Sequence, residues 1–197
     1  PIADFFDLFQ LGEGEELMLE MLALCRRAKE EGMTKPQFLR LAAQIPGIYV
    51  PSLYDPKYNS DGTIQEVVPK EGAPARVQKR IVKDISKMFF PDDFVVPFTE
   101  IVHDRAMVEV LRGCIRGCRF CQAGYIYRPF REKDPEVLDG QARTLCAATG
   151  YEEVSLTSLS TSDHSRLELL MEEMLPWTQQ KKVNIALPSL RVDNFSR

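Results

Sequence analysis

Three of the chain's five cysteines, Cys114, Cys118 and Cys121, fall within one short stretch with the spacing C-x3-C-x2-C. Three thiols cannot all pair as disulfides, and the odd total argues against the disulfide framework of a secreted protein. Thiolates are ligands for zinc and for iron–sulfur clusters. The spacing therefore predicts a metal centre that receives three protein ligands and keeps one position open.

Three kinds of site use clustered thiols. A structural zinc site needs four ligands, and His103, one of two histidines with His164, stands eleven residues before Cys114, an unusual spacing for such a site. A thioredoxin-like dithiol would use Cys118 and Cys121 and leave the third cysteine unexplained. A cubane cluster held by three cysteines keeps one iron free for a cofactor or substrate, and this interpretation accounts for every thiol.

The residues between the cysteines suit a negatively charged cluster. Gly113 and Gly117 allow the backbone to curl tightly and to approach the cluster closely. Phe120 is expected either to shield the cluster from water or to fill the core beside the loop. Three cations either offset the charge of thiolates and sulfides or face solvent: Arg112, Arg116 and Arg119.

The second half of the chain predicts alternating strands and helices, and therefore a parallel sheet with right-handed crossovers. The cysteines follow its first strand, at the carboxyl end where such sheets bind ligands. The expected elements are a strand at 106–111, a helix at 135–150 capped by Asp134, a strand at 154–156, a helix capped by Ser162 or Asp163 and ending before Pro176, and a strand at 183–187.

The first half predicts a strand, a glycine turn and two helices, followed by an extended region. Cys25 and Cys146 lie on helical stripes and are expected to be small buried core residues. The expected elements of the first half are a buried strand at 4–11, a turn at 12–14, a helix at 15–31, a helix from Thr34 to just before Pro46, and a hairpin turning at 59–62.

The run from Cys114 to Cys121, with an aromatic residue before the last cysteine, resembles the signature of the radical S-adenosylmethionine (radical SAM) superfamily. Its place after a first strand and ahead of βαβ units is also similar. The resemblance implies a full or partial (β/α) barrel, in which three cysteines bind a [4Fe–4S] cluster and the fourth iron chelates SAM. It further implies reductive cleavage of SAM to methionine and a 5′-deoxyadenosyl radical that takes hydrogen from a substrate.

The resemblance also implies cofactor-binding residues in the loops after the second and third strands, besides Phe120 in the cysteine loop. The family's glycines and acidic residue are absent after the second strand, so backbone carbonyls and the hydroxyls of Thr157, Ser158 and Ser160 are the candidates there. Helix capping is an equal explanation for Ser160. After the third strand the candidates are Ser189 and Arg191. No side chain is assigned a catalytic role.

The first half resembles the last strand and helix of the cobalamin-binding domain that precedes some radical SAM domains, through the Gly-Glu-Gly-Glu turn within 7–16. The whole chain is similar to an uncharacterised subfamily of these enzymes, in the segments PIADFF, YRPFRE and LPSLRVD. The D-x-H-x-x-G motif of the cobalt-ligating histidine is absent from the 197 residues. Cobalamin is therefore expected only in a longer parent protein.

An α/β fold in three parts follows from these resemblances. Residues 1–46 would be the end of a cobalamin-binding-type domain, 47–104 a linker with a hairpin, and 105–197 the first half of a radical SAM barrel, with about three βα units. A full barrel of eight βα units takes roughly 200 or more residues. We therefore expect the chain to be a fragment, catalytically inactive by itself, of an enzyme of the oxidoreductase or transferase class.

The composition of the chain argues against two classes of partner, nucleic acids and membranes. A net charge of −4 gives no electrostatic case for nucleic acid, and no run approaches the ~18 apolar residues of a membrane helix. With no signal peptide visible, unpaired cysteines indicate a reducing cytoplasm. The expected partners are SAM, an unknown substrate, an electron donor, and further copies of the chain through exposed sheet edges. A non-enzymatic iron–sulfur or zinc module, and a structural fragment with empty cysteines, remain as alternatives.

Overall fold

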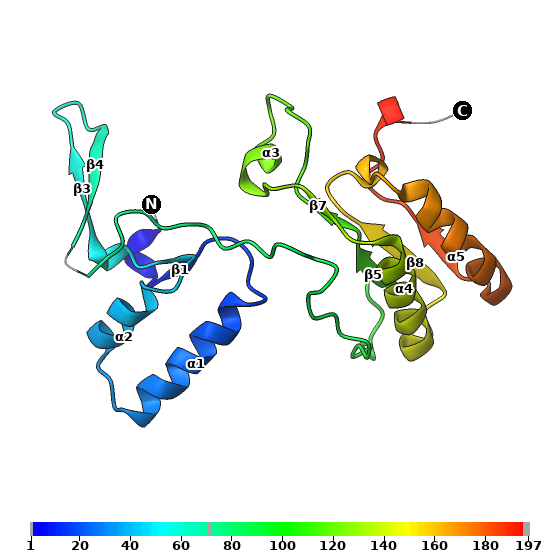
Figure 1. Ribbon diagram of the computed structural model, residues 1–197, viewed down its shortest axis with the longest axis horizontal. Helices are drawn as coiled ribbons and strands as arrows, with labels where there is room; N and C mark the ends of the chain where they lie inside the picture. Colours follow the sequence, from blue (N-terminus) through cyan, green and yellow to red (C-terminus); the bar gives the residue numbers. More distant parts are fainter. Residues whose placement is uncertain (1, 71, 195–197) are drawn as a thin grey trace. The chain divides into compact units, whose positions relative to one another are not determined.

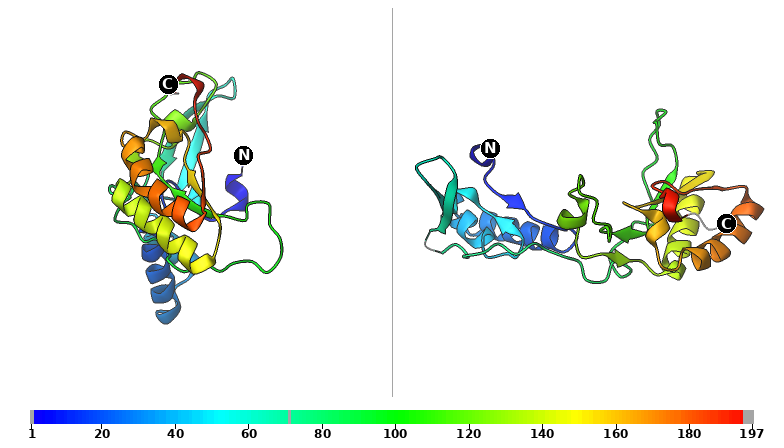
Figure 2. Two further views of the ribbon diagram at one scale, coloured as in Figure 1. Left: turned by 90° about the vertical axis from the view of Figure 1, so that its right-hand side faces the viewer. Right: turned by 90° about the horizontal axis from the view of Figure 1, so that it is seen from above.

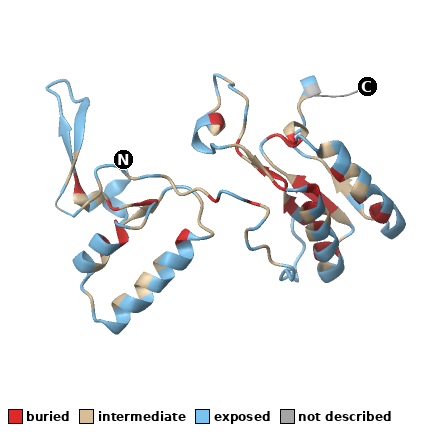
Figure 3. Ribbon diagram, in the orientation of Figure 1, coloured by how far each residue is buried: buried red, intermediate tan, exposed pale blue. Residues whose placement is uncertain are grey.

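The computed structural model describes residues 2–70 and 72–194 and divides the chain into two compact units, Pro1–Val82 and Lys83–Arg197. Both units combine helices with strands, so the chain is of the mixed α/β class (Figure 1). Each unit has its own cluster of buried apolar residues, drawn in red in Figure 3. The boundary at Val82 falls inside the region 47–104, and the division into three parts remains a prediction.

The first unit is built on two helices and two antiparallel strand pairs. Its buried core is formed by Leu17, Leu39, Ala42, Ala43, Ile48 and Val50. The elements are η1 (Ala3–Phe5), β1 (Phe9–Gln10), α1 (Leu17–Glu30), α2 (Lys35–Ala42), β2 (Ile48–Tyr49), η2 (Pro51–Leu53), β3 (Tyr54–Tyr58) and β4 (Ile64–Pro69). Strand β1 pairs with β2, and β3 pairs with β4 in a hairpin that turns at the predicted Asn-Ser-Asp-Gly segment.

Both helices of the first unit begin within two residues of their predicted starts, and α2 ends at Ala42, short of the predicted end before Pro46. At the start of α2, Thr34 and Gln37 form a capping box, in which the Thr34 backbone N–H donates to Gln37 Oε1 at 2.9 Å. Gly32 follows α1 with a φ of 63°, a left-handed conformation that glycine adopts without strain. Cys25, predicted to be buried on α1, is only half-buried.

The prediction of a buried strand over residues 4–11 is wrong. Only Phe9–Gln10 is extended and paired, and Phe5 in the preceding η1 is 81% exposed. The two-residue strand β2 offers too short an edge to pair the whole segment, and an apolar run is not buried unless a layer covers both its faces.

The second unit carries a three-stranded parallel sheet in the order β5-β8-β9. Helices α4 and α5 connect successive strands and contact each other. They lie side by side in both views of Figure 2. The elements are β5 (Ala106–Glu109), β6 (Leu111–Arg112), α3 (Ala123–Ile126), β7 (Arg131–Glu132), α4 (Pro135–Thr149), β8 (Glu153–Thr157), η3 (Thr161–Asp163), α5 (Leu167–Lys181), β9 (Asn184–Ala186) and η4 (Val192–Asn194). The predicted β-α-β-α-β order and the parallel sheet are therefore confirmed.

Helix α4 matches its sequence signals at both ends. Asp134 is the N-cap residue and Pro135 takes the first helical position, where its missing N–H leaves no bond unmade. Gly150 ends the helix with a φ of 74° and donates its N–H to the Cys146 carbonyl. Cys146 is buried on this helix, as predicted, and burial raises the pKa of its thiol.

Helix α5 does not end before Pro176, as the sequence had indicated. It continues to Lys181 because the residues after the proline are anchored in the core. Trp177 is 4% exposed and donates from Nε1 to Asp139 Oδ1 at 2.6 Å. Thr178 is also buried and donates to the Met174 carbonyl at 2.9 Å. This packing offsets the hydrogen bond that proline removes from a helix.

Two adjacent leucines on α5 predict very different costs of truncation. Leu170 is fully buried against the sheet, whereas Leu169 is 43% exposed. Leu170→Ala is expected to lower the unfolding free energy of the second unit by about 2–5 kcal/mol, because it leaves a cavity in a close-packed core. Leu169→Ala should cost less than about 1 kcal/mol. Urea unfolding followed by circular dichroism measures both, and equal losses would contradict the assigned packing.

Candidate metal centre

The cysteine loop leaves the sheet through a short antiparallel pair and returns through the same pair. Strand β6 pairs with β7, with Leu111 opposite Glu132 and Arg112 opposite Arg131. Just beyond β7, the Lys133 N–H donates to the Val110 carbonyl at 3.0 Å. The loop between these strands is therefore held at its base and lies at the carboxyl end of β5, where parallel sheets bind their ligands.

Glycine is required where the loop begins. Gly113 has a φ of 90°, and a Cβ there would lie 2.8 Å from the Tyr127 carbonyl oxygen and 2.9 Å from Phe130 Cα. The two ends of the loop thus pass each other more closely than any side chain allows. Gly117 differs, because nothing lies within 4 Å of its Cβ position.

All three cysteines of the loop are free thiols and half-buried. The Cys114 sulfur accepts the Arg116 N–H at 3.4 Å, and the Cys121 N–H donates to the Cys118 carbonyl at 3.0 Å. Within residues 2–70 and 72–194, no three His, Cys, Asp or Glu side chains come close enough to hold one metal ion. A cubane cluster binds its thiolates at separate iron atoms, so its ligands need not meet at one point.

The three arginines of the loop have different partners. Arg112 makes two hydrogen bonds to the Glu109 carboxylate, each of 2.9 Å. Arg116 donates from Nε to Asp163 Oδ2 at 3.0 Å and from Nη2 to Asp163 Oδ1, and this bond raises the pKa of the Arg116 guanidinium. Arg119 is exposed. Two of the three cations are therefore already paired with carboxylates of the protein.

The loop after β8 carries the three predicted hydroxyl residues. Thr157 Oγ1 donates to the Val108 carbonyl at 3.3 Å, and Ser158 Oγ accepts the Ser160 N–H at 3.1 Å. Ser160 is 3% exposed, and its Oγ has no hydrogen-bond partner among the described residues. The hydroxyl of Thr161 lies 2.8 Å from the Pro188 carbonyl and so ties this loop to the one after β9.

The loop after β9 holds Arg191 in hydrogen bonds and leaves Ser189 exposed. Arg191 forms two 3.0 Å hydrogen bonds with Asp193, which raise the pKa of the guanidinium and lower that of the carboxyl. The backbone N–H of Arg191 donates to Ser162 Oγ at 3.3 Å, which connects this loop to the one after β8. Ser189 has a φ of 61°, a left-handed conformation that is uncommon outside glycine.

Phe120 and the two histidines lie in different surroundings. Phe120 is 93% exposed, so its ring does not fill the core beside the loop, and its role in shielding a cluster stays a prediction. His164 is buried, with Nε2 3.0 Å from the Lys133 carbonyl and Nδ1 accepting the Arg166 N–H. His103 Nδ1 lies 2.7 Å from an Arg105 nitrogen. Both imidazoles are engaged away from the thiols.

The prediction that Ser162 or Asp163 caps the helix after β8 is wrong. Helix α5 begins at Leu167 with Arg166 as its N-cap residue. Asp163 instead ends η3, its side chain is 1% exposed, and it binds Arg116. A carboxylate in the polar run after a parallel strand is the signal that could have identified it, since that edge of the sheet faces the cysteine loop.

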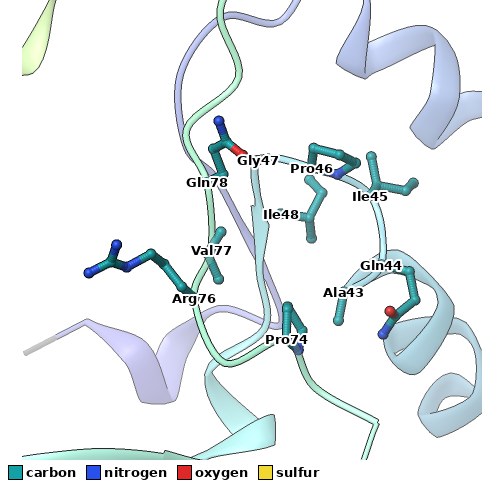
Figure 4. Close-up of a pocket in the computed structure, with 10 residues that line it drawn as sticks. All are labelled: Ala43, Gln44, Ile45, Pro46, Gly47, Ile48, Pro74, Arg76, Val77 and Gln78. Atoms are coloured by element: carbon teal, nitrogen blue, oxygen red, sulfur yellow. The ribbon is translucent and has the colours of Figure 1, made fainter.

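The first unit contains a small pocket whose lining includes no cysteine. It is lined by the segments 43–48 and 74–78 (Figure 4). Arg76 is the charged residue of this lining, and its side chain extends away from the other labelled side chains. The lining mixes apolar residues with the polar side chains of Gln44, Arg76 and Gln78, and Arg76 is the titratable residue in it.

Comparison with known proteins gives two family matches and one relative. Residues 1–51 match the family described as radical SAM proteins, N-terminal, and residues 108–193 match the radical SAM superfamily. The uncharacterized protein MJ0966 of Methanocaldococcus jannaschii is 25% identical over the whole chain. The chain spans 36% of the length of that curated relative.

The second match covers the cysteine loop, the sheet and the loops after β8 and β9. A radical SAM domain implies a [4Fe–4S] cluster and SAM. The three free thiols in one loop have the donor chemistry of such a cluster. Two segments of the chain are thus similar to radical SAM proteins, and the second of these segments carries the cysteines.

Proposed function

We propose that Cys114, Cys118 and Cys121 hold a [4Fe–4S] cluster whose fourth iron binds SAM. The observation that carries the proposal is the meeting of three unpaired, half-buried thiols with the polar loops after β8 and β9 at one edge of a parallel sheet. Those loops are where ligands of parallel sheets bind. A single zinc ion fits less well, since the described histidines are engaged elsewhere.

The residues proposed to bind SAM differ in whether their side chains already have hydrogen-bond partners. The Ser160 hydroxyl is buried without a partner among the described residues, and a buried hydroxyl is stabilised by gaining a hydrogen bond. The hydroxyls of Thr157 and Ser158 already have hydrogen-bond partners, so each would bind SAM while keeping its present bond. Arg191 is connected to the cysteine loop through Asp193 and Arg116 and would bind the carboxylate of SAM, with Ser189 and Phe120 at the margin of the site.

When bound, the cluster and SAM supply a reductively generated carbon radical, and the chain's part is to bind, orient and protect. The reaction class, an oxidoreductase or a transferase acting on an unknown substrate with an external electron donor, is proposed from the family.

The cobalamin link of residues 1–46 stays a prediction, since the family matched there is named only as the N-terminal part of radical SAM proteins. A cytoplasmic location and pairing of chains through the sheet edges also stay predictions. Among the described residues no helix is long and apolar enough to cross a bilayer.

Anaerobic reconstitution of the chain with iron and sulfide tests the proposal. We expect about four iron and four sulfide per chain, as in a [4Fe–4S] cluster. With a reductant and SAM, formation of 5′-deoxyadenosine would show that the cluster cleaves the cofactor. A chain that takes up zinc alone, at one equivalent and with all three cysteines protected, would instead favour the zinc module.

A further inference from the structure

Alternating charges connect the cysteine loop to the loops after β8 and β9. Arg116 binds Asp163 through both carboxylate oxygens, and its Nη1 lies 3.8 Å from Asp193 Oδ2. Asp193 in turn binds Arg191 through two hydrogen bonds of 3.0 Å. The three loops that follow the three parallel strands are thus joined by side chains as well as by the sheet.

Asp163 is the most deeply buried side chain among these four charged residues. Its side chain is 1% exposed, and its N–H donates to the Ser160 carbonyl at 3.0 Å within η3. An ionised carboxylate is removed from water at a high free-energy cost unless a cation and hydrogen bonds compensate for it. A guanidinium that binds both carboxylate oxygens gives that compensation with a defined geometry. The position of Arg116 is therefore set by a group that cannot relax into solvent.

Arg116 transmits this position to the cysteines because it lies between two of them. Its N–H donates to the Cys114 sulfur at 3.4 Å. Its carbonyl oxygen lies 2.8 Å from the Cβ position of Gly124, so the chain after Cys121 packs directly against it. A shift of Arg116 would move the backbone on both sides, toward Cys114 and toward Cys118.

We infer that Arg116 and Asp163 are positioning residues that hold the backbone between Cys114 and Cys118 in the shape that receives the cluster. The inference rests on the proposed function for the identity of that cluster, but the holding of the loop is a property of the metal-free chain. Asp193 contributes less, because its side chain is 53% exposed and solvent weakens its 3.8 Å approach to Arg116.

The first test is the alkylation of individual cysteines in the reduced, metal-free chain, mapped by mass spectrometry. Rates are compared at the alkaline plateau, where the thiols are ionised and the rate reports access rather than thiol pKa. Arg116→Gln and Asp163→Asn should each raise the plateau rates of Cys114 and Cys118 by about threefold or more, through local opening of the loop. The double variant should be no faster than either single variant, because both remove one interaction.

Matched controls separate positioning from general destabilisation. Arg119→Gln removes a cation from an exposed position in the same loop and should leave both rates unchanged. Asp193→Asn should have a smaller effect than Asp163→Asn. Cys25 and Cys146 serve as references in every variant. Unchanged rates at Cys114 and Cys118, or equal increases at Cys146, would overturn the inference.

Cluster content distinguishes failure of this inference from failure of the proposed function. After reconstitution, iron and sulfide per chain should fall severalfold in Arg116→Gln and Asp163→Asn and stay at the wild-type level in Arg119→Gln. If the wild-type chain takes up no cluster while the alkylation differences hold, the proposed function fails and the positioning role stands. If the wild type binds a cluster and both variants bind it equally well, the positioning role fails.

Discussion

Replacement of Cys118 by alanine is expected to reduce the iron and sulfide of the reconstituted chain to near background. Cys118 is the middle of the three thiols in the sequence. Two of the three cysteine ligands remain in the variant. A second iron atom would then lack a protein ligand, besides the iron proposed to bind SAM. Iron and sulfide analysis with the visible absorption of the cluster measures the loss.

Cysteines outside the loop provide the controls for this result. Cys146→Ala removes a buried thiol on α4, and Cys25→Ala removes a half-buried thiol on α1 in the other unit. Both variants should bind the wild-type amount of iron and sulfide. Wild-type cluster content in Cys118→Ala, or a loss in Cys146→Ala as large as in Cys118→Ala, would show that the cluster is not held by the loop.

Gly113→Ala is expected to have the second largest effect, although it alters no ligand. The φ of 90° is strained for alanine, and the new Cβ would lie within 3.0 Å of backbone atoms of Tyr127, Pro129 and Phe130. Backbone atoms cannot move aside as a flexible side chain can, so the loop must shift by a few tenths of an ångström or more. We expect a loss of stability of about 1–3 kcal/mol and a severalfold loss of cluster content.

Gly117→Ala is the matched control, since it adds the same methyl group to the same loop. Nothing lies within 4 Å of its Cβ position, and its φ is outside the left-handed region. Thermal unfolding and iron content should therefore stay close to wild type. Equal effects at the two glycines would mean that the passage of Gly113 against residues 127–130 does not shape the site.

Local signals in the sequence predicted most of the second unit. The Asp134–Pro135 start and the Gly150 stop of α4 depend on backbone chemistry within one turn, and both hold in the structure. The alternation of strands and helices was enough to predict the parallel sheet. Where tertiary contacts decide, the sequence misled. Helix α5 continues past Pro176 because Trp177 and Thr178 are buried.

The sequence was enough to propose the cluster ligands, but it did not predict the contacts that surround them. The spacing of Cys114, Cys118 and Cys121 is local, so it could be interpreted from the sequence alone. The pairing of Arg116 with Asp163 joins residues 47 apart in the sequence, and no local pattern predicts such a contact. The exposure of Phe120 was missed for a related reason: an aromatic residue in a loop is buried only where another element covers it.

The central claim is that three cysteines hold a cluster with one iron open to SAM. Electron paramagnetic resonance of the reduced, reconstituted chain, recorded with and without SAM, tests it most directly, with Cys118→Ala recorded alongside. The account predicts the signal of a reduced [4Fe–4S] cluster that changes when SAM is added and is absent from the variant. A reduced cluster whose signal is unchanged by saturating SAM would contradict the claim of an open iron.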